Sequence, residues 1–125
     1  MQKFQTSTSE LTTTTNNTPT NICGIGGYAN NSAGVYRARV MARAQGADEV
    51  KTWDVSFGWR KGSTGTLEIT GSLVALLVVG NPLLATAGWS VEAVAVSGNT
   101  YLAVKGDGNS TVDWAAYADC EYLEQ

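Results

Sequence analysis

Apolar and polar residues alternate with a period of two along most of this chain. In residues 51–60, one face of an extended segment carries large apolar side chains: Trp53, Val55, Phe57 and Trp59. The other face carries polar ones: Asp54, Ser56 and Arg60. A half-buried β-strand has this pattern because successive side chains point to opposite faces. No segment shows a convincing helical period, so the sequence predicts an all-β fold.

Short turn-like stretches separate the alternating segments. Nine alternating segments, which together are expected to form about eight strands, cover 3–14, 18–25, 35–44, 51–60, 66–71, 72–80, 89–96, 101–106 and 110–123. Because nothing between them is long enough for a helical crossover, the strands should run antiparallel and close into a two-sheet, jelly-roll-like sandwich. Residues 16–125 are expected to form this single domain, and residues 1–15 an extended N-terminal arm or a first strand.

The four tryptophans could either fill a buried core or form an exposed binding platform. Trp53, Trp89 and Trp114 stand in alternating segments beside small residues, which would let the indole rings interdigitate between two sheets. Trp59 is also expected in the core, although it adjoins a basic tip. The tip, 59–65, is therefore a candidate contact surface.

The segment LVALLVV (73–79) is apolar on both faces of an expected strand. A two-layer sandwich covers a strand on one side, so a second subunit is the expected cover on the other side. This predicts an obligate oligomer with Val74, Leu76 and Val78 at the interface. The alternative is that the loop at 81–88 folds over the strand.

Charge and composition narrow the classes of partner. The 125 residues carry a formal net charge of −3 and only 15% charged residues, so no basic field is present to hold nucleic acid. The longest apolar run is far shorter than the ~20 residues of a membrane-spanning helix, and the first residues lack a signal-peptide core. The chain is expected to be made in a cytoplasm, with no nucleic acid partner and no membrane insertion.

Three arginines, Arg37, Arg39 and Arg43, share one face of the expected strand at 35–44. This stripe is either a solvated face that pairs with acids on a neighbouring strand or a surface that docks against another subunit or a scaffold.

The chain offers little for catalysis or cofactor binding. It has no histidine, which removes the commonest general base and metal ligand. Cys23 and Cys120 are far apart in sequence, and whether they form a disulfide is left open, with buried free thiols favoured. Asp107, Asn109 and Asp113 have calcium-like spacing but lack the closing glutamate, so a tight turn is the better interpretation. No enzyme, cofactor or metal is expected.

Several motifs together resemble a recurrent bacteriophage virion domain. They are the opening TTTTNNTPTNI (12–22), the arginine-rich strand at 35–46, the strand at 51–62 and the closing run at 88–123. The matching pairs and triplets are Trp89-Val91, Leu102-Val104-Gly106 and Val112-Trp114-Ala116. These are packing and turn motifs that cover most of the chain, and the pattern departs from the group at 73–88. The resemblance implies β-sandwich knobs of phage fibres, spikes and head decoration, usually trimeric, and transfers no catalytic residue.

The leading hypothesis is a non-enzymatic virion protein, a homotrimer that decorates or cements the capsid by binding the major capsid protein or another virion component. A fibre tip would follow a long shaft, and these residues contain none. The alternative is a receptor- or host-glycan-binding knob of a fibre or spike, with contacts from two loops: Tyr28, Asn30, Asn31, Trp59 and Arg60. A small carbohydrate-active enzyme is a weaker third hypothesis.

Overall fold

The computed structural model describes residues 1–46, 49–79 and 88–125, with the side chains of Val78 and Val79 outside that description. The described residues form strands and turns, without a helix. The strands are β1 (Gln2–Thr14), β2 (Thr20–Ile25), β3 (Ser32–Ala44), β4 (Val50–Lys61), β5 (Leu67–Val79), β6 (Ser90–Val96), β7 (Asn99–Lys105) and β8 (Val112–Glu124). The prediction of an all-β fold with about eight strands is confirmed.

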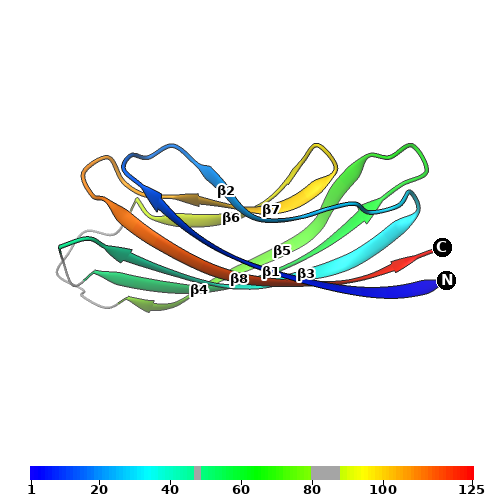
Figure 1. Ribbon diagram of the computed structural model, residues 1–125, viewed down its shortest axis with the longest axis horizontal. Helices are drawn as coiled ribbons and strands as arrows, with labels where there is room; N and C mark the ends of the chain where they lie inside the picture. Colours follow the sequence, from blue (N-terminus) through cyan, green and yellow to red (C-terminus); the bar gives the residue numbers. More distant parts are fainter. Residues whose placement is uncertain (47–48, 80–87) are drawn as a thin grey trace.

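The strands form two antiparallel sheets (Figure 1). The large sheet has the order β1-β8-β3-β4-β5, and the small sheet has the order β2-β7-β6. In Figure 1 the small sheet lies above the long, curved strands of the large sheet, and the two chain ends lie together at the right. The expected two-sheet sandwich is therefore present.

Strands from the two ends of the chain pair with each other. The first strand pairs with the last, β1 with β8, and the second with the second-last, β2 with β7, as in a jelly roll. Strands β3, β4 and β5 then follow each other as a meander within the large sheet. The β6–β7 hairpin turns on Ser97 and Gly98, whose φ angles of 51° and 79° suit a two-residue hairpin turn.

Residues 2–14 belong to the domain's own sheet. They pair with β8 at every position from Gln2↔Glu124 to Thr14↔Val112. Strand β1 thus forms one edge of the large sheet. To add β1 to the sheet of a neighbouring molecule, residues 2–14 would first have to separate from β8. Deleting residues 1–15 would expose the edge of β8.

Strand β5 is continuous where the sequence indicated two short pieces. It follows β4 from Lys61↔Leu67 to Lys51↔Val79, with irregularities at Gly58/Trp59 and Thr52/Trp53. At the second irregularity Leu77 has no register partner, as in a β-bulge. Bulges of this kind let a long edge strand keep pairing with a twisted neighbour.

The core fills the space between the sheets with aromatic rings and small residues. Each tryptophan is at most 4% exposed, so the prediction that Trp53, Trp59, Trp89 and Trp114 are core residues is confirmed. Small side chains such as Ala38, Ala42 and Ala118, all buried, leave room for the rings. The rings of Trp53 and Trp114 stack at 5.6 Å, and such contacts add to the stability gained from burial.

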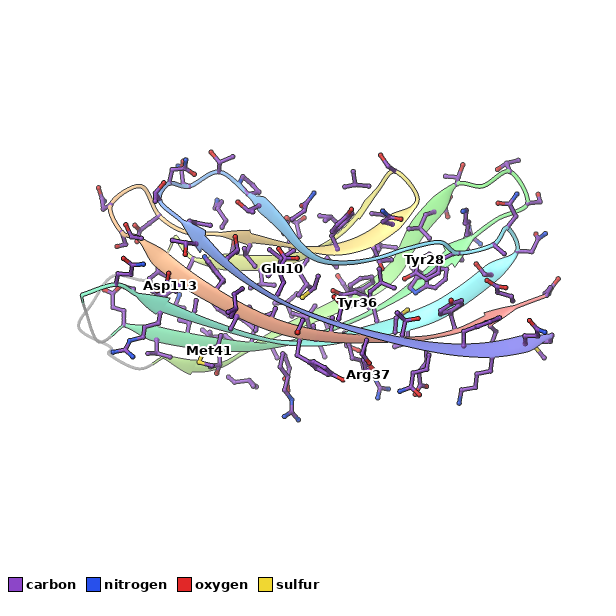
Figure 2. The ribbon with its side chains drawn as sticks, in the orientation of Figure 1. Glu10, Tyr28, Tyr36, Arg37, Met41 and Asp113 are labelled. Atoms are coloured by element: carbon purple, nitrogen blue, oxygen red, sulfur yellow. The ribbon has the colours of Figure 1, made fainter. Side chains whose placement is uncertain are left out.

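Hydrogen bonds of Cys23 connect the small sheet to the large one. Cys23 stands at a bulge in β2 with a φ of 53°. Its carbonyl accepts a bond of 2.8 Å from the Tyr36 hydroxyl on β3, and its N–H donates at 3.2 Å to Glu10 Oε1 on β1. Figure 2 shows Tyr36 between the sheets. The backbone groups freed by the bulge are thus satisfied across the sandwich.

Candidate interaction surface

The outer face of the large sheet, the face turned away from β2, β7 and β6, carries many exposed apolar and charged side chains. Strand register arranges these side chains in rows across the sheet. One row, the apolar row, runs Leu11, Ala115, Met41 and Thr52 across four strands. The next row runs Ser9, Tyr117, Arg39, Asp54 and Ala75 across five. Figure 2 shows Arg37 and Met41 projecting from this outer face.

Most of the large exposed apolar side chains lie on this face: Leu11, Val35, Met41, Leu73, Leu77, Tyr117 and Leu123. Leu11 is 82% exposed and Met41 is 50% exposed. Leu77, Met41, Leu11 and Tyr117 line a shallow depression of about 550 Å³ along the apolar row. Large contiguous apolar surfaces of this kind mark interaction sites in soluble proteins.

Charged side chains surround the depression. Arg37, Arg39 and Arg43 project from β3, as predicted, and all three are exposed. In register they face Asp119, Tyr117 and Asp113 on β8. Arg39 also approaches Asp54 on β4, with Nε 3.9 Å from Oδ1. The structure therefore places acids of both neighbouring strands beside the basic stripe.

Strand β5 is the other predicted interface. Val74 is 38% exposed and Leu76 is 50% exposed, although both point toward the side of the small sheet. Three strands cannot cover five, so the inner face of this edge strand is only partly covered. The side chain of Val78 and the loop at 81–88 lie outside the described residues, except for Gly88.

The predicted ligand-contact residues divide into two groups. Loop residues Asn30 and Asn31 are exposed and lie beside the β4–β5 hairpin, where Asn30 Nδ2 donates to the Ser63 carbonyl at 3.2 Å. Arg60 is exposed and forms an ion pair of 2.8 Å with Glu68. The structure thus brings the two predicted loops together.

The two aromatic members of that prediction are corrected by the structure. Tyr28 is 3% exposed and Trp59 is 1% exposed, so neither offers a ring to a ligand. Tyr28 folds back from its glycine-rich loop and stacks on Trp59 with ring centroids 3.9 Å apart (Figure 2 labels Tyr28). Its hydroxyl lies 2.8 Å from Thr100 Oγ1, so the buried polar group is satisfied.

Both cysteines are buried free thiols, which answers the question the sequence left open. Burial and the nearby Glu10 carboxylate raise the pKa of the Cys23 thiol to about 11, and burial also raises the pKa of Cys120. Neither thiol is therefore poised to act as a nucleophile at neutral pH.

The residues with calcium-like spacing form a turn. Asp107 Oδ1 accepts a bond of 2.9 Å from the Asn109 N–H, while Asp113 bonds to Thr13 and Gln45 instead. Asp107 also accepts from Trp89 Nε1 at 3.0 Å. Burial would raise the pKa of Asp107, but these bonds outweigh it and lower that pKa. Over the described residues, no cluster of three or more His, Cys, Asp or Glu side chains suits a metal ion.

Leu11, Met41 and Tyr117 of the outer face were not among the residues predicted from the sequence. The signal was present, because each occupies a position that strict alternation assigns to solvent. Leu11 stands among threonines and Met41 stands between two arginines, so the polar neighbours concealed the pattern. Only the order of the strands in the sheet shows that these positions adjoin.

Comparison with known proteins gives no family. No family model matches the sequence, and no curated protein matches it. Among solved structures, the chain is similar to the tailspike protein of Acinetobacter baumannii phage AM24, with a TM-score of 0.44 and 12% identity over 95% of this chain. The chain spans 26% of the length of that tailspike chain.

The described part of the chain also contains no helix with the length and hydrophobicity that a membrane crossing requires.

Proposed function

We propose that this chain is a non-enzymatic structural subunit of a bacteriophage particle, which associates with copies of itself as a homotrimer and decorates the capsid. The sequence motifs that resemble phage virion domains support the assignment of this chain to a phage particle. The exposed apolar side chains on both faces of β5 and across the outer face support the self-association, and this observation carries the proposal.

The cost of exposing apolar area to water favours self-association. Burying apolar surface is favourable by roughly 25 cal/mol per Å². Leu73, Leu76 and Leu77 are each at least half exposed on one edge strand. An edge strand with apolar side chains on both faces is also a site for unwanted aggregation. A defined oligomer would cover these side chains and remove that hazard.

Sedimentation of the purified chain tests the oligomer. The chain has a mass of 13.2 kDa, and a homotrimer would sediment with three times that mass. A well-folded monomer over the whole accessible concentration range would overturn the self-association.

Binding to particles tests the location. The tagged chain is expected to co-purify with assembled shells, and a carbohydrate-turnover screen is expected to stay silent. Co-purification with isolated fibres together with glycan binding would replace decoration by the receptor-binding alternative. Turnover in the screen would overturn the non-enzymatic assignment.

A further inference from the structure

We propose that the outer face of the large sheet is the interface between copies of this chain, with the β1/β8 half of one copy packed against the β3/β4/β5 half of another. This inference rests on the proposed self-association and specifies its surface. The occupant is a second copy because the two halves of the face have complementary charge.

The two halves carry opposite sign among the described residues. The β1/β8 half presents three acids and one lysine: Asp113, Asp119, Glu121 and Lys3. The β3/β4/β5 half presents four arginines and two acids: Arg37, Arg39, Arg43, Arg60, Asp54 and Glu68. Contact between unlike halves brings opposite charges together, whereas contact between like halves is repulsive.

Pairs within one chain leave these charges available. The Arg39 and Asp54 side chains are 87% and 54% exposed although they form an ion pair of 3.9 Å. Such solvent-exposed pairs contribute little to stability, so exchanging them for contacts with a second copy costs little.

Each half also presents apolar side chains that would meet in the same contact. Leu11, Tyr117 and Leu123 are exposed on the β1/β8 half, and Met41, Leu73 and Leu77 are exposed on the other half. The depression along the apolar row extends across both halves. Tyr117 on one copy would also lie against arginines of the other, a favourable contact of a cation with an aromatic ring.

A copy that contacts two neighbours, one through each half, covers its whole outer face. Five strands at about 4.8 Å spacing and the 13 residues of β3 at about 3.3 Å each give a face of roughly 1,000 Å². Each single contact uses the two-strand half of one copy and the three-strand half of another, so it covers roughly 400–600 Å² per partner. Only the two contacts of one copy taken together exceed the about 800 Å² that a standard interface buries per partner. Because every copy carries one half of each sign, successive contacts of unlike halves can close into a ring, as a homotrimer requires.

Charge reversal tests this pairing by sedimentation equilibrium. Asp119→Arg with Glu121→Arg makes both halves basic, and Arg37→Glu with Arg39→Glu makes both halves acidic. Each double variant is expected to weaken self-association at least about tenfold, and all four changes in one chain should restore it. The control Glu92→Arg reverses an exposed charge on β6 and should associate like the wild type.

The outcomes separate the two proposals. Near-UV circular dichroism checks that each variant is folded. If a reversal variant does not fold, Asp119→Asn with Glu121→Gln replaces it, with an expected weakening of about threefold. Folded reversal variants that associate like the wild type would overturn the interface and leave the proposed function standing. A wild-type chain that never self-associates would overturn both.

Discussion

The two faces of the large sheet use the same strands for different purposes. On the inner face, Trp53 and Trp59 of β4 are nearly inaccessible, because Trp53 packs against Trp114 and Trp59 packs against Tyr28. On the outer face, Leu11 and Met41 are as apolar as many core residues but remain exposed among arginines and acids. The inner face therefore stabilises the fold, whereas the outer face carries the apolar side chains that we propose a second copy covers. The difference shows that apolar character alone does not identify a core.

The largest expected effect comes from removing a ring of the inner face. Trp59→Ala should lower the free energy of unfolding by about 3–5 kcal/mol, because it leaves a cavity beside Tyr28 and Tyr122. Urea unfolding at fixed protein concentration measures this loss. The matched outer-face change, Tyr117→Ala, should shift the free energy of unfolding by less than about 0.5 kcal/mol under conditions that keep the chain monomeric. Equal losses for the two variants would refute the contrast between the faces.

A smaller effect is expected from adding a methyl group to the inner face. A Cβ at position 34 would lie 2.6 Å from the Glu121 carbonyl oxygen and 2.8 Å from Trp59 Cε2. Gly34→Ala should therefore cost about 1–3 kcal/mol through overpacking.

The control for this change is Gly71→Ala on β5. A Cβ at position 71 would meet no atom within 4 Å, so this variant should unfold almost like the wild type. A Gly34→Ala chain that unfolds at the same urea concentration as the control would show that the close packing is not required.

On the outer face, a substitution should change association without changing unfolding. Met41→Lys places a charge in the apolar row and is expected to weaken self-association several-fold. It should leave the free energy of unfolding of the monomer within about 0.5 kcal/mol. Val96→Lys is the matched control, because Val96 is 42% exposed on the small sheet. Equal effects of the two changes on the sedimentation profile would argue against an interface at the apolar row.

The smallest expected effect is the contribution of Asp107 to the loss of stability at acid pH. The lowered pKa of Asp107 means that its carboxylate stabilises the fold above its unfolded pKa, near 3.8. This contribution is lost as the pH falls through the folded value. Asp107→Asn should therefore reduce the fall in melting temperature between about pH 5 and about pH 2. Glu92→Gln, an exposed control on β6, should melt like the wild type at each pH.

Much of the fold could be predicted because alternation is local. Trp53, Val55, Phe57 and Trp59 were assigned to one face from their spacing, and all four are buried. The same reasoning placed the arginines of β3 on the opposite face. Tyr28 was assigned to an exposed loop because its glycine-rich surroundings gave no period, and its contact with Trp59 crosses 31 positions of sequence.

The sequence by itself determined which residues share a face of each strand, since the extended backbone fixes the direction of successive side chains. The tertiary structure decided which faces are covered. Covering depends on the order of strands from distant parts of the chain, and here three strands lie over five. That mismatch leaves β5 partly bare, and the register of β1, β8, β3 and β4 gathers Leu11, Met41 and Tyr117 into one surface.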